Sequence, residues 1–99
     1  MTHENAPLSD EELLALRLAP REGIIVEAIA DELIIFSEQD NATYSLNGPA
    51  AVIWRLLDGE RTGSDILSRL EEAYESGPTA GEVATTLRGL RSTGLIGER

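Results

Sequence analysis

Residues 24–46 read IIVEAIADELIIFSEQDNATYSL, and this stretch decides the fold class. Two short β-branched runs, 24–29 and 33–36, are separated by a polar turn, which is typical of a β-hairpin. After a second polar turn, residues 43–46 alternate polar and apolar side chains, as a half-buried strand requires. The stretch therefore predicts a three-stranded antiparallel meander with its third strand at an edge of the sheet.

Three helices are predicted after the sheet, each with a polar residue at its start and a glycine near its end. Their starting residues are Asn47, Thr62 and Thr79, and their closing glycines are Gly59, Gly77 and Gly94. Leu95 and Ile96 are expected to fold back onto the last helix. A capping box at residues 9–12 predicts a further short helix, about residues 10–18, that ends at Pro20.

The expected fold class is thus α+β, with a β-meander followed by three α-helices and a short extra helix at the N-terminus. We expect residues 1–22 to form a tail that contains the short helix, and residues 23–97 to form the domain. A chain of 99 residues is long enough for one small core.

Composition excludes several classes of function. The 18 acidic and 8 basic residues give a net charge of -10, which opposes binding to nucleic acid or to an anionic membrane. The absence of cysteine rules out thiolate metal sites, and the lone His3 stands in a polar N-terminal stretch. No apolar run approaches the roughly 20 residues that span a bilayer. A cytoplasmic protein without a metal or cofactor is expected.

Catalytic patterns are also missing. No nucleophile stands with a base, and the paired acids Asp31-Glu32 and Glu71-Glu72 fall in a predicted turn and on a polar helix face. Solvation explains both pairs. The sequence therefore predicts no catalytic residue and a protein that is not an enzyme.

One motif is specific. Residues 44–54, YSLNGPAAVIW, are followed by Leu57-Asp58-Gly59, by a threonine-capped stretch from Thr62 to Tyr74, and by Gly94-Leu95. Together they closely resemble the PqqD-like family of peptide chaperones, also called precursor-peptide recognition elements or RiPP recognition elements. The resemblance covers about residues 24–96, with the elements in the family's order.

The resemblance implies a small winged-helix-like domain that binds the leader of a ribosomally synthesised precursor peptide. Such domains present the precursor to a modifying enzyme, such as a radical enzyme, a cyclase, a protease or a glycosyltransferase. The leader adds as a strand beside the third strand, in the groove between that strand and the last helix. This mode suits an edge strand, whose backbone groups are unpaired.

The last helix supplies the other wall of that groove. At 100° per residue, Ala84, Arg88 and Arg91 share one flank of this helix, and Glu82 and Thr86 share the other. The arginine flank is the one suited to an acidic leader, although both arginines could equally be solvated or balance the helix dipole. The predicted peptide-binding residues are Thr43, Tyr44, Ser45, Leu46, Ala84, Leu87, Arg88 and Arg91.

Two other functions stay open. A winged-helix DNA-binding regulator has a similar arrangement of elements, but the last helix offers only Arg88 and Arg91 to a phosphate backbone. A structural subunit of a modification enzyme would stabilise the enzyme without contacting the leader. Binding of an isolated leader would distinguish the leader-binding function from that of a structural subunit.

Overall fold

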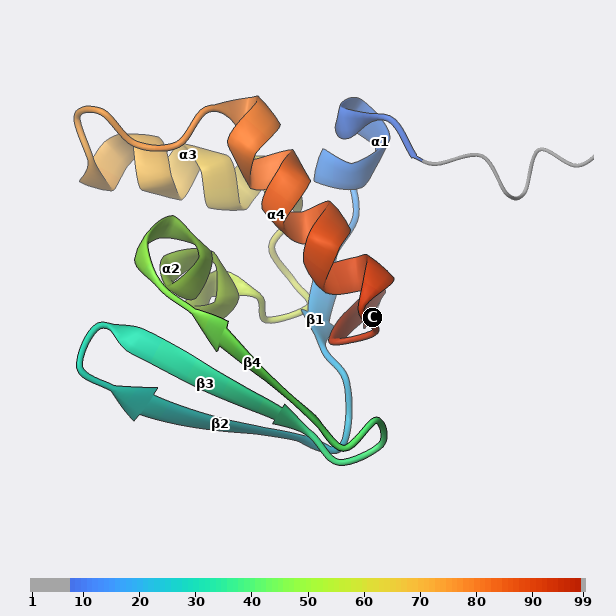
Figure 1. Ribbon diagram of the computed structural model, residues 1–99. Coiled ribbons are helices and arrows are strands. Elements are labelled where there is room, and N and C mark those ends of the chain that lie inside the picture. Colours follow the sequence, from blue (N-terminus) through green and yellow to red (C-terminus); the bar gives the residue numbers. More distant parts are fainter. Residues whose placement is uncertain (1–7, 99) are drawn as a thin grey trace, which may run out of the picture.

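The central feature of the fold is a three-stranded antiparallel sheet with all the helices on one of its faces (Figure 1). The computed structural model describes residues 8–98. The strands follow the order β2-β3-β4, and their bounds are Ile24–Ile29, Glu32–Ser37 and Ala42–Leu46. The predicted meander is confirmed, and β4 lies at an edge of the sheet.

The helices after the sheet are also confirmed, as is the α+β class. They are α2 (Gly48–Leu56), α3 (Gly63–Ala73) and α4 (Ala80–Ser92). Capping boxes at Thr62 and Thr79 begin α3 and α4. Helix α4 ends at a left-handed Gly94, after which the N–H of Leu95 donates to the carbonyl of Leu90 at 3.1 Å. The expected return of residues 95–96 onto this helix is therefore present.

The short N-terminal helix differs from the expectation. Helix α1 spans Asp10–Leu14 only, and the prediction that it continues to residue 18 was wrong. Residues Leu18–Pro20 instead form β1, which pairs antiparallel with β5 (Ile96–Glu98), a second sheet that the sequence did not predict. The carbonyl of Leu18 accepts a hydrogen bond from the N–H of Gly59 at 3.1 Å, so tertiary contacts hold this backbone extended.

One continuous aliphatic core lies between the sheet and the helices. Strand β3 turns its odd-numbered side chains, Leu33 and Ile35, into this core, as the period of a strand requires. Leu13, Leu14 and Leu18, which precede the sheet, are buried in the same core. Segments from both ends of the chain thus contribute to one packing unit.

No helix in residues 8–98 combines the length and the hydrophobicity of a membrane span.

Helices pack closely at Gly63, the first residue of α3. A Cβ atom added there would lie 2.8 Å from the Cα of Leu14 in α1 and 3.1 Å from a methyl group of Leu87 in α4. Such distances are well inside van der Waals contact. Glycine at position 63 is therefore what allows α1 to pack where α3 and α4 meet.

We predict that Gly63→Ala lowers the free energy of unfolding by about 1–3 kcal/mol, because the backbone of α1 has to move away from the new methyl group. Gly89→Ala in α4 is the matched control, since nothing lies within 4 Å of its added Cβ. There the gain in helix propensity should raise stability by about 1 kcal/mol. Urea unfolding measures both changes, and equal effects of the two variants would contradict the close packing.

The link between α2 and α3 is organised by Asp58. Its Oδ1 accepts hydrogen bonds from the N–H groups of Arg61 and Glu60, both at 2.9 Å, and its Oδ2 lies 3.0 Å from Nη1 of Arg61. These backbone hydrogen bonds, the one from Arg61 first, lower the pKa of the Asp58 carboxyl below its usual value. The charged form therefore stabilises the folded state.

Because this pKa is lower in the folded state than in the unfolded state, the stabilisation is complete above the ordinary pKa of aspartate. It is lost as the pH falls through the lowered value. We predict that Asp58→Asn destabilises the domain at pH 7 and that its difference from the unsubstituted protein shrinks by pH 3. Urea midpoints at both pH values check this. The control Glu71→Gln, on the exposed side of α3, should show no comparable change.

Candidate functional site

The open edge of β4 is the first part of the candidate site. The N–H of Glu38 donates to the carbonyl of Gly23 at 3.0 Å, so Glu38 directs its backbone groups towards β2. This direction alternates from residue to residue along an antiparallel strand. The odd-numbered residues of β3 therefore direct their backbone groups towards β4. Their partners there are Ala42, Tyr44 and Leu46.

It follows that Thr43 and Ser45 direct their N–H and C=O groups away from β3, towards the open edge. The sequence alone could not decide which of the two alternating sets is free. The side chains alternate as well: Tyr44 and Leu46 are half-buried on the helix side, whereas Thr43 and Ser45 are exposed on the other face. The Ser45 hydroxyl donates to Oε1 of Glu32 at 2.8 Å.

Helix α4 contributes to a groove at the end of this strand. In the view of Figure 1, β4 is the strand of the three-stranded sheet drawn nearest to α4. A groove lies between the N-terminal ends of α2 and α4, and its lining includes Asn47, which follows β4, together with Pro49, Glu82, Thr86 and Asp10 of α1. The flank of α4 that faces this groove is therefore the one that carries Glu82 and Thr86.

The arginine flank of α4 faces α1 and β5. Nη2 of Arg88 donates to the carbonyl of Leu8 at 3.0 Å and to Oδ1 of Asp10 at 2.9 Å. Nη2 of Arg91 lies 3.9 Å from a carboxylate oxygen of Glu98. The carboxylates beside these arginines thus belong to this chain. The sequence did not reveal this arrangement, because it depends on where α1 packs.

The eight predicted residues therefore divide into two groups. The four on β4 lie together at the open edge. Of the four on α4, Ala84 and Leu87 are 0% exposed, and they can shape a groove only from behind. Arg88 and Arg91 keep about 41% of their side chains exposed, next to intramolecular carboxylates. A role for all eight in peptide binding stays a prediction.

Glu82 and Thr86 are the groove residues that the sequence analysis set aside. The helical period places them on the flank opposite the arginines. The arginine flank was the one predicted to bind the leader, because its charge suits an acidic peptide. One signal in the sequence was the capping box at residues 9–12. It predicts a short helix that has to pack on part of the domain, and that helix packs beside the arginine flank of α4. The hydroxyl of Thr86 donates a hydrogen bond to the backbone carbonyl of Glu82 at 3.0 Å, within α4 itself.

Groups for metal or acid–base chemistry do not gather at this edge. Within residues 8–98, no three histidine or carboxylate side chains cluster closely enough to hold a metal ion. The pKa of Asp65 is lowered chiefly by a hydrogen bond from the backbone N–H of Thr62, which belongs to the capping box of α3. The site thus offers backbone hydrogen bonds and a groove.

The comparisons agree with this architecture. The family model for coenzyme PQQ synthesis protein D (PqqD) matches residues 32–96, and the chain belongs to the PqqD family. The resemblance stated from the sequence is confirmed. No curated protein matches the chain.

One similar solved structure is that of TbiB1 in complex with the TbiA(beta) leader peptide. The TM-score is 0.67 at 20% sequence identity, and the alignment covers 79% of this chain and 93% of that one. At this level of identity the likeness establishes a shared fold.

The backbone directions in β4 predict the hydrogen exchange of the free protein. The amides of Thr43 and Ser45 should exchange roughly tenfold or more faster than the amide of Tyr44, which bonds β3. Amide-resolved exchange by NMR checks this. Strand β2 is the internal control, since there Val26 should exchange faster than Glu27 for the same reason. Equal protection along β4 would show that its edge is already covered.

Proposed function

We propose that this chain binds the leader of a ribosomally synthesised precursor peptide by adding it as a strand to β4. The observation that carries the proposal is the row of outward backbone groups at Thr43 and Ser45, on an edge strand that ends at a groove between α2 and α4. Membership of the PqqD family supports it, as does the leader peptide bound to TbiB1.

The energetics divide between backbone and side chains. Thr43 and Ser45 offer one donor and one acceptor each. At about 1 kcal/mol per hydrogen bond, the backbone contributes about 4 kcal/mol. A micromolar complex requires about 8 kcal/mol, and ordering a flexible leader costs more. Leader side chains in the groove have to supply the difference, so the groove sets the choice of leader.

Thr43, Tyr44, Ser45 and Leu46 form the backbone part of the proposed site. Ala84 and Leu87 support the groove from behind. Arg88 and Arg91 contribute if leader carboxylates replace Asp10 and Glu98 as their partners. On this proposal the protein is non-catalytic and presents the bound precursor to a modifying enzyme, such as a radical enzyme, a cyclase, a protease or a glycosyltransferase.

The charge distribution opposes the DNA-binding alternative. A recognition helix requires free cationic side chains, and both arginines of α4 lie beside carboxylates of the same chain. The third reading, a structural subunit, makes a different prediction: such a subunit would not bind an isolated leader.

Titration with a synthetic leader, without added metal or nucleotide, tests the proposal. We expect a dissociation constant on the order of micromolar. Single N-methyl groups on the leader should weaken binding at alternating positions, because every second leader amide bonds β4. Uniform interference, or interference every three to four residues, would argue against an added strand.

Substitutions at Ser45 test the same geometry from the protein side. Ser45→Pro removes an outward N–H without removing a bond to β3, so the fold should persist while leader affinity falls about three- to tenfold. Ser45→Ala is the matched control: it removes the bond to Glu32 but keeps the amide, and affinity should stay within about twofold. Equal affinities for the two variants would place the leader elsewhere.

A further inference from the structure

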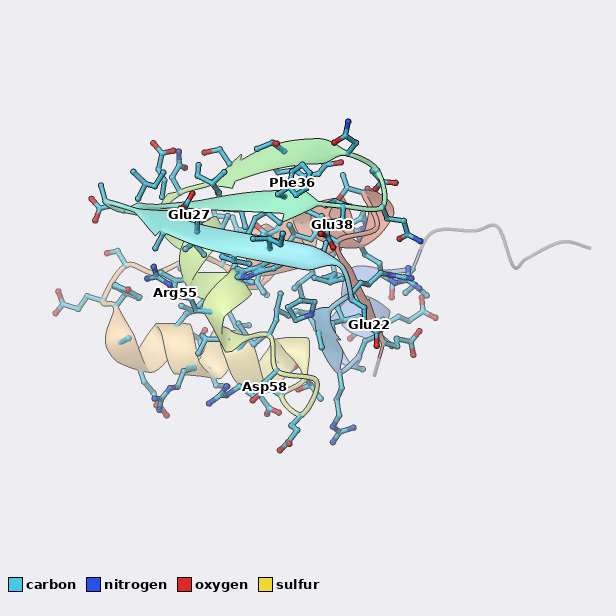
Figure 2. The ribbon with its side chains drawn as sticks, turned by 90° about the horizontal axis from the view of Figure 1, so that it is seen from below. Glu22, Glu27, Phe36, Glu38, Arg55 and Asp58 are labelled. Atoms are coloured by element: carbon cyan, nitrogen blue, oxygen red, sulfur yellow. The ribbon has the colours of Figure 1, made fainter. Side chains whose placement is uncertain are left out.

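The face of the sheet turned away from the helices is a second surface, separate from the β4 edge and from the groove between α2 and α4. Ile34 and Phe36 of β3 point to this face, because their neighbours Leu33 and Ile35 point into the core. In register, Phe36 lies beside Ile25 of β2. Figure 2, which views this face, shows no other described element in front of β2, β3 and β4.

This outer face is apolar at its centre, where Ile34 and Phe36 lie on the middle strand β3, and Ile25 and Ile29 flank Glu27 on the edge strand β2. Ile25 is 52% exposed and Ile29 is 55% exposed, and Ile34 and Phe36 are half-buried between the neighbouring strands. Single exposed apolar side chains are common on protein surfaces. A contiguous set on a flat sheet face is typical of an interaction surface.

The rim of the same face is acidic. Figure 2 shows Glu27 and Glu38 on this side, near Phe36. No basic residue occurs between Arg21 and Arg55, a stretch that includes the whole sheet and contains six acids. These are Glu22, Glu27, Asp31, Glu32, Glu38 and Asp40. None of the ion pairs within residues 8–98 involves a carboxylate of the β2-β3-β4 sheet.

These charges indicate which kind of partner fits the outer face. A second copy of this chain would bring two acidic rims together, and nucleic acid and anionic lipid are repelled for the same reason. The complementary partner is a protein surface with an apolar centre and lysine or arginine around it.

We propose that the outer face of the β2-β3-β4 sheet docks a basic, apolar surface of the modifying enzyme; this rests on the function proposed above. A leader strand beside β4 would extend the same sheet, and every second side chain of the leader would lie on the outer face next to Thr43 and Ser45. An enzyme on this face therefore meets the sheet and the leader together, and a bound leader strengthens docking.

The test uses the full chain, a synthetic leader and the purified enzyme that modifies the same precursor. The variant Glu27→Arg/Glu38→Arg reverses two rim charges away from the β4 edge. We expect it to weaken enzyme binding about tenfold in low salt and to leave leader affinity within about twofold. The control Glu71→Arg/Glu72→Arg makes the same charge change on α3 and should bind the enzyme like the unsubstituted chain.

A second variant, Ile25→Ser/Ile29→Ser, tests the exposed apolar side chains of this face, and circular dichroism confirms that each variant is folded. Enzyme affinity of this variant should fall at least about fivefold. Equal losses in the rim variant and the α3 control would overturn the docking site, as would unchanged enzyme affinity in both outer-face variants. Sedimentation that shows a dimer lost in the isoleucine variant would assign the face to a second copy instead.

The leader titration separates the two proposals. If no version of the chain binds the leader, but the enzyme binds and the outer-face variants weaken it, the docking face stands and the leader function falls. If the leader binds and the outer-face variants leave enzyme affinity unchanged, the leader function stands and the docking face falls.

Discussion

The antiparallel pairing of β3 with both of its neighbours is the constraint on which the rest of this structure depends. The pairing sets the phase of the whole sheet. Leu33 and Ile35 enter the core, so Ile34 and Phe36 have to face away from it. The same phase directs the backbone groups of Thr43 and Ser45 to the open edge. A shift of one residue would exchange the two faces and the two sets of amides at once.

The packing of α1 has the next largest effect on the site. Gly63 leaves room for Leu14, and α1 therefore lies against α3 and α4. That position places Asp10 beside Arg88. An exposed ion pair contributes little to stability, so burial of Leu13 and Leu14 is the main reason that α1 stays there.

The distribution of charge separates the two sides of the molecule. The described arginines precede or follow the sheet, and the segment between Arg21 and Arg55 carries only acids. On the helix side, Arg61, Arg88 and Arg91 lie next to carboxylates of the same chain. The outer face of the sheet holds carboxylates around an apolar centre. One small domain thus combines an open backbone edge with an acidic face that carries exposed apolar side chains.

The sequence by itself determined the parts of this protein that depend on neighbours along the chain. The alternation in residues 43–46, the capping boxes at Thr62 and Thr79, and the glycine cap at Gly94 are local interactions, and each predicted its element. The motif in residues 44–54 was enough to identify the PqqD family.

Only the tertiary structure decided which amides of β4 are open, that Leu18–Pro20 is a strand, and that α4 turns Thr86 towards the groove. Each of these depends on the element that packs or pairs against the segment in question. Such a partner lies far away in the sequence, and local periodicity describes both flanks of a helix and both phases of a strand equally well.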